Sequence, residues 1–258
     1  MNNIAVGIVG GTRGMGSWLA DLLQKENYTV HICGRKTPLG IKDIAGLCDV
    51  VVVAVPISAT EKVIKEVGPL LDESKLLMDL TSLKKEPVEL MLAHTRAEVI
   101  GCHPLFGPAM PDFSGQNIIL CPARNTKWLA WVTELFQKNN YKIFETDPAH
   151  HDKMMAIVQV LNHLHTISLG MTIAATPTSP EELDRFSTPL LRTKMEIVKK
   201  VFAESPDLYA DIITRNPDTA KIIALYEKAL ADIRTLAQSG DAAKLKEALE
   251  KTAKILFS

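Results

Sequence analysis

The chain has 258 residues, of which 47% are hydrophobic and 23% charged, and its formal net charge is -1. This balance is typical of a globular protein, and the small charge excludes broad electrostatic attraction to nucleic acid or to an acidic membrane surface. The four cysteines form no C-x-x-C pair, which argues against a zinc site or a disulfide framework. Without a signal-peptide pattern or a membrane-spanning apolar run, we expect a cytoplasmic protein.

The first predicted strand covers residues 4–9 and runs into a cluster of glycines, after which a helical pattern begins at Ser17. Strand, glycine turn and helix in this order form dinucleotide sites, because backbone N–H groups can then approach a pyrophosphate. In the frame G-x-G-x-x-G, arginine stands at the second glycine position, where it could itself reach a phosphate. The alternative is a glycine-rich turn without a ligand. The predicted cofactor contacts are Gly10, Gly11, Thr12, Arg13, Gly14, Met15 and Gly16.

The second predicted strand, 29–33, ends at Gly34-Arg35-Lys36. Sites that prefer NAD carry an acidic residue here, about 20 residues past the glycines, to bind the ribose 2′-hydroxyl. This chain instead offers space at Gly34 and positive charge at Arg35 and Lys36, which suit a 2′-phosphate. We therefore predict NADP as the cofactor, with NAD possible. The alternative is that the two cations are a solvated loop pair.

Further apolar strand patterns alternate with helical patterns, which predicts an α/β fold with a doubly wound, mostly parallel sheet. Ligands bind such sheets beyond the carboxyl ends of the strands. The loops beginning near Pro56, Thr81 and His103 should therefore converge on one crevice. The predicted strands cover 49–56, 76–82, 98–102, 117–121 and 142–145, and the predicted helices cover 60–71 and 127–139.

After about Pro148 the pattern becomes entirely helical, so we divide the chain into a Rossmann-type domain, 1–148, and an all-α domain, 149–258. The first helix of the second domain is apolar around much of its girth and should be buried. One small helical domain can hide that surface only in part, which predicts a homodimer through the helical domains. The predicted helices cover 151–175, 180–204, 207–213, 218–238 and 242–256.

Two residues at the expected crevice could carry proton chemistry. His103 follows a predicted strand, and imidazole is the side chain best suited to take a proton near neutral pH. The alternative is a structural histidine. Ser82 offers a hydroxyl that could bond a substrate alcohol or a neighbouring imidazole, or could simply cap a turn.

The helical half adds two further candidates. His163 lies in the apolar helix and could equally be a core or interface histidine. Arg192, in an otherwise apolar stretch, needs an anionic partner if it is buried, and that partner could be a protein or a substrate carboxylate. His150, His151 and Asp152 are adjacent at a helix start, where the dipole favours Asp152, and with no further ligand cluster we reject a metal site.

Several stretches together resemble the prephenate dehydrogenase family, the arogenate/prephenate dehydrogenases of tyrosine biosynthesis. The resemblance spans nearly the whole chain, and the glycine turn is similar to that of compact archaeal-type members, so we expect no chorismate mutase domain. The stretches are Val55-Pro56-Ile57, Asp79-Leu80-Thr81-Ser82-Leu83-Lys84, Gly101-Cys102-His103-Pro104-Leu105-Phe106-Gly107-Pro108, His151-Asp152, Gln159-Val160-Leu161-Asn162-His163 and Thr188-Pro189-Leu190-Leu191-Arg192.

The resemblance implies a Rossmann domain followed by a helical dimerisation domain, and oxidative decarboxylation of prephenate to 4-hydroxyphenylpyruvate with NAD or NADP. It implies that His103 accepts the proton of the ring hydroxyl, that Ser82 assists there, that Arg192 binds a substrate carboxylate and that His163 lines the same pocket. It also brings Val55, Pro56 and Ile57 to the cofactor. Three alternatives remain open: an arogenate dehydrogenase, a hydroxyacid dehydrogenase of the 3-hydroxyisobutyrate type, and a non-catalytic NADP-sensing protein.

Overall fold

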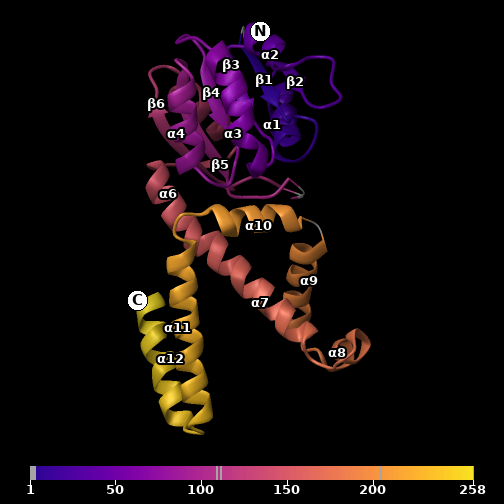
Figure 1. The fold of residues 1–258 in the computed structure, drawn as a ribbon, viewed down its shortest axis with the longest axis vertical. Helices are drawn as coiled ribbons and strands as arrows, with labels where there is room; N and C mark the ends of the chain where they lie inside the picture. Colours follow the sequence, from indigo (N-terminus) through magenta and orange to yellow (C-terminus); the bar gives the residue numbers. More distant parts are fainter. Residues whose placement is uncertain (1–3, 109, 111, 204, 258) are drawn as a thin grey trace.

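The structure, a computed structural model, describes residues 4–257 except 109, 111 and 204. Its first half is a seven-stranded sheet in the order β2-β1-β3-β4-β5-β6-β7 (Figure 1). The first five strands are parallel, whereas β6 runs antiparallel to β5 and β7 runs parallel to β6, which confirms the mostly parallel sheet. The strands are β1 (Ala5–Val9), β2 (Thr29–Cys33), β3 (Val50–Val53), β4 (Leu76–Asp79), β5 (Glu98–Pro104), β6 (Asn117–Arg124) and β7 (Lys142–Glu145).

Helices cover both faces of the sheet because its central strands are apolar on both sides. Trp18 and Leu19 of one helix and Phe136 of another pack on one face. Ile44, Ile64 and Met91, from three other helices, pack on the opposite face. The first pair are α1 (Gly14–Lys25) and α5 (Trp128–Lys138); the other three are α2 (Ile41–Leu47), α3 (Ile57–Val67), which continues into a 3₁₀ turn (Gly68–Leu70), and α4 (Lys85–His94).

Four strands end at different residues from those that the apolar pattern predicts, and one of them, β6, runs to Arg124, beyond the predicted end at 121. β3 stops before Pro56, which has no N–H to donate and precedes α3. β4 stops at Asp79, whose carboxylate accepts the N–H of Thr81 at 2.9 Å and turns the chain. β5 is longer than predicted: His103 pairs with Ile119 of β6, so it lies in the strand itself and not in the loop that follows.

The second half is helical and extends away from the sheet (Figure 1). Its first rod is continuous, although its middle is a π-helix. The expected single helix over 180–204 is wrong: it is two helices, because Pro189 disfavours helical backbone at the residue before it. The elements are α6 (Pro148–Met155), the π-helix (Ala156–Leu161), α7 (Asn162–Ala174), α8 (Pro180–Phe186), α9 (Pro189–Ala203), α10 (Pro206–Arg215), α11 (Thr219–Gln238) and α12 (Ala242–Leu256).

A small apolar cluster joins the two halves. Ile57 at the start of α3 and Leu83 after β4 pack against Ala156 and Val160 of the π-helix and Ile212 of α10. All are nine-tenths buried or more, with Val160 fully so. This seam fixes the rod beneath the carboxyl ends of β3 and β4.

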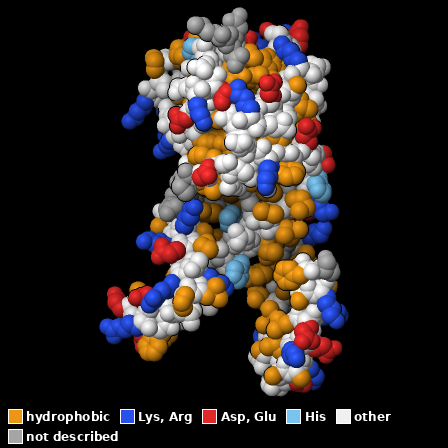
Figure 2. Space-filling model, turned by 180° about the vertical axis from the view of Figure 1, so that it is seen from behind, with side chains coloured by type: hydrophobic (Ala, Val, Ile, Leu, Met, Phe, Trp, Pro, Cys, Tyr) orange, Lys and Arg blue, Asp and Glu red, His pale blue; other side chains and the backbone are white. Residues whose placement is uncertain are grey.

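Away from the seam, the helical half leaves much apolar surface uncovered. Within the described residues, all but three of the exposed large hydrophobic side chains belong to it. On the long rod, Ile157 and Val158 are about half exposed and Met171 is 63% exposed. Figure 2 shows hydrophobic side chains along the α11–α12 arm and histidines between the two arms. One chain therefore buries its apolar rod only in part. No described helix is long and apolar enough to cross a membrane.

Candidate active site

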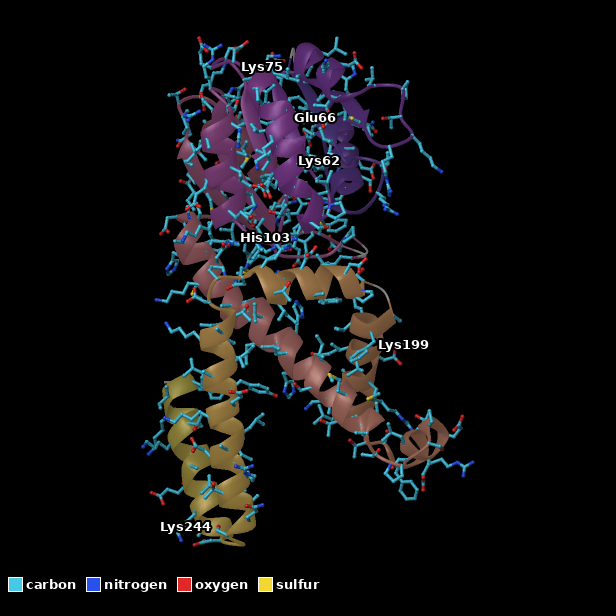
Figure 3. All side chains as sticks on the ribbon, in the orientation of Figure 1. Lys62, Glu66, Lys75, His103, Lys199 and Lys244 are labelled. Carbon is cyan, nitrogen blue, oxygen red and sulfur yellow. The ribbon has the colours of Figure 1, made fainter. Side chains whose placement is uncertain are left out.

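The site centres on His103, near the carboxyl end of β5. Its side chain is 3% exposed. Figure 3 shows it at the border between the sheet and α10. The parallel strands β4 and β5 bring the Thr81–Lys84 loop to the same edge of the sheet, because Asp79 of β4 pairs with Gly101 of β5.

A chain of hydrogen bonds fixes the His103 ring. His103 Nδ1 lies 2.9 Å from His151 Nε2, and His151 Nδ1 lies 2.8 Å from Asp152 Oδ1. A carboxylate only accepts, so the proton between His151 and Asp152 is on His151 Nδ1. When both rings are neutral, His151 Nε2 then accepts the Nδ1–H of His103. His103 Nε2 is left unprotonated, which is what a general base needs.

Asp152 also joins the two halves of the chain. Its carboxylate accepts the backbone N–H groups of Lys84 at 2.8 Å and Lys85 at 3.0 Å, at the start of α4. Its carbonyl oxygen accepts the side-chain amide of Asn216 at 2.9 Å. The dipole argument for Asp152 therefore applies to a neighbouring helix and not to its own. His150, two residues before Asp152, is exposed. The described residues contain no group of three His, Cys, Asp or Glu side chains that could hold a metal ion.

A buried ion pair lies beneath the loop that carries Ser82. Lys84 Nζ contacts Asp79 Oδ2, and both side chains are fully buried. The same Asp79 oxygen lies 2.6 Å from the Thr81 hydroxyl, whereas Asp79 Oδ1 has no hydrogen-bond partner. The pair and Thr81 hold the loop rigidly, so Ser82, which is half-buried, is presented at the edge of the sheet next to β5.

The surroundings of His103 keep it neutral. Burial lowers the pKa of His103 well below its ordinary value, and His151 and the Lys84 ammonium lower this pKa further. Gln159, on the π-helix, lies on the open side of the ring, with its amide nitrogen 3.4 Å from His103 Nε2. Its Oε1 atom is buried without a hydrogen-bond partner. π-Helical turns are frequent at functional sites, and this one faces the reactive nitrogen.

The glycine turn has the geometry of an anion site. Gly10 has φ +96°, and a side chain there would collide with the carbonyl of Ala54. A Cβ at Gly16 would lie 2.5 Å from the Gly10 oxygen, so only glycine lets α1 pack this closely. The first turn of α1 has no side-chain cap at Arg13 and no acidic residue, so its N–H groups are free to bind a pyrophosphate.

The basic turn after β2 lies beside the glycine turn. Thr37 holds it by accepting the Gly34 N–H at 2.7 Å, and a Cβ at Gly34 would lie 3.1 Å from the Thr12 methyl group. Arg35 and Lys36 are exposed and form no ion pair within the part of the chain that the structure describes.

The three residues of the predicted cofactor segment Val55-Pro56-Ile57 lie in different surroundings. A Cβ at Gly10 would lie 3.0 Å from Val55 Cγ1, so Val55 borders the glycine turn. Pro56 is exposed, whereas Ile57 is 9% exposed and packs into the seam between the domains.

Each of the two helical candidates contacts a residue of the helical half. His163 is half-buried, its ring lies 4.7 Å from the Tyr209 ring, and burial lowers its pKa. Arg192 Nε lies 3.2 Å from Asp184 Oδ1, and the two side chains are 57% and 72% exposed. Asp184 belongs to α8, which Figure 1 draws at the end of the α7–α9 arm, away from the sheet. Within one chain, Arg192 therefore does not reach His103.

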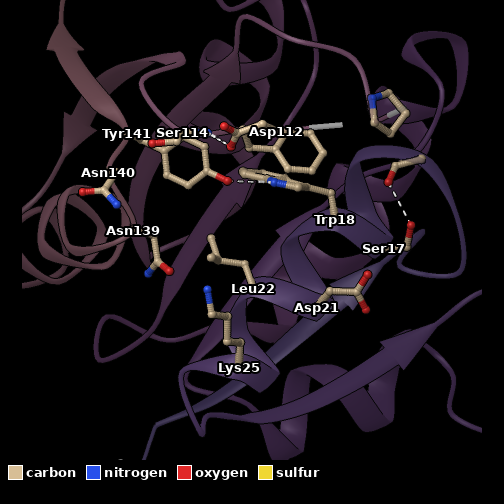
Figure 4. A pocket seen from close by; sticks show the side chains of 13 residues that line it. Ser17, Trp18, Asp21, Leu22, Lys25, Asp112, Ser114, Asn139, Asn140 and Tyr141 are labelled. Atoms are coloured by element: carbon tan, nitrogen blue, oxygen red, sulfur yellow. Dashed lines mark hydrogen bonds between the residues drawn. The ribbon is translucent and has the colours of Figure 1, made fainter. Parts of the chain in front are cut away.

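A hollow lies elsewhere, beside α1. It has a volume of about 440 Å³ and is bordered by α1, the loop after β5 and the start of β7. Trp18 forms its floor and donates a hydrogen bond to Tyr141 at 3.1 Å (Figure 4). Its lining includes Gly14 of the glycine turn, but not His103.

This fold and this site define a class: two-domain proteins in which a dinucleotide-binding α/β domain precedes a helical domain. The particular family follows from the sequence. Residues 26–145 match the family model "Prephenate dehydrogenase, nucleotide-binding domain", and residues 147–251 match "Prephenate dehydrogenase, dimerization domain". The chain belongs to the prephenate dehydrogenase family.

Individual relatives agree with this assignment. The chain is 34% identical over 98% of its length to a Methanocaldococcus jannaschii protein named "Probable arogenate/prephenate dehydrogenase", and 31% identical over 91% of its length to the T-protein of Haemophilus influenzae. It spans 61% and 62% of those two proteins.

Solved structures share the fold. A prephenate dehydrogenase from A. aeolicus, in complex with hydroxyphenyl propionate and NAD+, superposes with a TM-score of 0.77 at 21% identity and covers 99% of both chains. The Synechocystis arogenate dehydrogenase superposes with a TM-score of 0.78 at 18% identity, over 97% of this chain and 98% of that one.

Sequence reasoning overlooked the partners of His103. His151 and Asp152 were considered as metal ligands and as part of a resemblance, and Gln159 only as part of that resemblance. The available signal was the buried His-Asp pair at the start of an apolar helix, since two adjacent polar residues there must find partners.

The neutral state of His103 has a consequence for stability. The unfolded chain binds a proton at this histidine below about pH 6.5, whereas burial keeps the folded site from doing so. Stability is therefore greatest above that pH and falls as pH drops, by up to about 1.4 kcal/mol per pH unit for one proton. We expect urea unfolding of His103→Asn between pH 5 and pH 6.5 to show a shallower pH slope than the wild type. His150→Gln, at an exposed position, is the control; equal slopes in wild type and His103→Asn would contradict the assignment.

Proposed function

We propose that the chain oxidises and decarboxylates prephenate, or its amino counterpart arogenate, with a nicotinamide dinucleotide. The observation that carries the proposal is the hydrogen-bonded line of His103, His151 and Asp152 at the carboxyl edge of the dinucleotide-binding sheet, which leaves His103 Nε2 unprotonated. When bound, the cofactor supplies the hydride acceptor. Four free, buried cysteines fit a cytoplasmic location.

In this proposal the side chains bind and orient the substrate and transfer one proton. His103 takes the proton of the substrate ring hydroxyl while the carbon that carries it loses a hydride. Loss of the ring carboxylate as CO₂ then makes the ring aromatic, so that step needs little help. Ser82, on its rigid loop, bonds the same hydroxyl and orients it toward His103, and His163 lines the substrate pocket.

The cofactor site favours NADP in this proposal. The free N–H groups of α1 bind the pyrophosphate, and the glycine turn from Gly10 to Gly16 follows it closely. Arg35 and Lys36 carry positive charge beside that turn, where a ribose 2′-phosphate would lie. Val55 and Pro56 complete the cofactor side of the crevice, whereas Ile57 acts by fixing the helical domain.

The working form in this proposal is a homodimer. The exposed apolar side chains of the helical half are the surface that a second copy would cover. Arg192 lies far from its own His103, and its ion pair with Asp184 is exposed, so we assign its guanidinium to a substrate carboxylate in the site of the other subunit. Exposed ion pairs stabilise little, so the arginine can exchange Asp184 for a substrate.

The activity can be tested directly by the absorbance of reduced nicotinamide, with prephenate or arogenate and either cofactor supplied. We expect turnover by the wild type, and we expect His103→Asn to lower kcat by about 10²–10⁴-fold with nearly unchanged cofactor affinity, because it removes a general base. Cofactor binding without turnover would instead identify a cofactor-sensing protein.

The proposed preference for NADP can be tested at Arg35. Arg35→Ala should lower kcat/KM for NADP and leave kcat/KM for NAD nearly unchanged, because only NADP has the 2′-phosphate. Lys42→Ala, on the exposed face of α2, serves as a charge-matched control. An unaltered ratio between the two cofactors in Arg35→Ala would contradict this role.

Mixed dimers test which subunit supplies Arg192 to each active site. One subunit carries His103→Asn and the other carries Arg192→Ala, so each subunit lacks one of the two groups. If a site combines His103 of one chain with Arg192 of the other, half of the sites in a mixed dimer are intact, and co-expression restores about a quarter of wild-type activity at low substrate. If both groups come from one chain, every site stays defective and no activity returns.

A further inference from the structure

Three buried side chains form one line through the site. His103 belongs to β5, whereas His151 and Asp152 belong to α6, and the two hydrogen bonds between them are 2.9 Å and 2.8 Å long. Each side chain is only 2–3% exposed, so water does not compete for these bonds. Protons can move along such a line without leaving the protein.

We propose that His151 stores the positive charge of the reaction. When His103 Nε2 takes the substrate proton, the proton on His103 Nδ1 passes to His151 Nε2, and the charge rests on His151 against the Asp152 carboxylate. This inference rests on the proposed function and deepens it. His151 acts through His103 and does not touch the substrate, so it is a positioning residue with a proton-storing role.

The balance of the reaction returns a proton to the substrate oxygen that loses one. The hydroxyl proton leaves the substrate while the hydride departs and a carbonyl forms. When the carbon–carboxylate bond breaks, its electron pair enters the ring and the oxygen becomes phenolic, so it takes a proton back. The overall oxidation releases no net proton, because one hydride and one CO₂ leave a dianion as a monoanion. A proton held in the site between the two steps can be returned to that oxygen without exchange with solvent.

Charge favours His151 over His103 as the holder. A cation on His103 would lie in a fully buried position near the Lys84 ammonium, whereas a cation on His151 lies 2.8 Å from a carboxylate oxygen. Burial raises the pKa of the Cys102 thiol, and it raises the pKa of the Cys121 thiol to about 12. Neither thiol is therefore charged at neutral pH. The charged or titratable groups around the line are Asp79 and Lys84 from β4 and its loop, Cys102 from β5, Cys121 from β6, and Asp147 and Asp152 from α6 and its N-cap.

Two conservative variants separate storage from orientation. His151→Gln can still accept the Nδ1–H of His103 through its amide oxygen but cannot take the proton. Asp152→Asn keeps an acceptor for the start of α4 but removes the negative charge. In both, the conjugate acid of the base is less stable, so the acidic limb of the kcat profile should move to lower pH by about one to three units. The plateau of kcat should fall by at least about tenfold, because the base is weaker.

The controls distinguish the possible failures. Wild-type turnover in the same series tests the proposed function itself, and His150→Gln should change neither the limb nor the plateau. A limb that stays in place in both variants overturns the storage role, even if kcat falls, because loss of orientation alone lowers the plateau without moving the limb. If neither variant folds, single-turnover rates of the wild type in mixtures of H₂O and D₂O decide: a curved dependence indicates two moving protons, and a straight line overturns the proposal.

Discussion

The Asp152 carboxylate is the interaction on which the rest of the site depends. One oxygen accepts both the ring proton of His151 and the N–H of Lys84, and the other accepts the N–H of Lys85. A single buried anion thus orients the histidine line, caps α4 and holds the loop of Ser82. Removing one partner from such a buried set is costly, because the remaining groups lose hydrogen bonds that water cannot replace. Fold and chemistry are therefore coupled through one side chain.

The apolar contacts between the two halves explain why the helical half extends away from the sheet. The seam of Ile57, Leu83 and Val160 fixes only the top of the rod, beneath the crevice. The lower helices keep exposed apolar faces, as expected for a chain whose family model describes a dimerisation domain.

Local pattern predicted much of this architecture. The apolar runs located all seven strands, because the buried central strands read directly as apolar runs. The ends of the edge strands β2 and β7 also match the prediction. His103 was placed correctly at the carboxyl edge but assigned to a loop, because its pairing with Ile119 depends on a distant strand. The roles of His151 and Asp152 depend on contacts across 48 and 68 residues of chain, which periodicity does not encode.

The central claim is that His103 is neutral, with its proton on Nδ1 and none on Nε2. Nitrogen NMR of the protein with ¹⁵N-labelled histidine, at neutral pH and without substrate, reports the protonation of each ring nitrogen. The account predicts that His103 and His151 both carry a proton on Nδ1 and none on Nε2. A proton on His103 Nε2 would contradict it, because that nitrogen could not then accept one from a substrate.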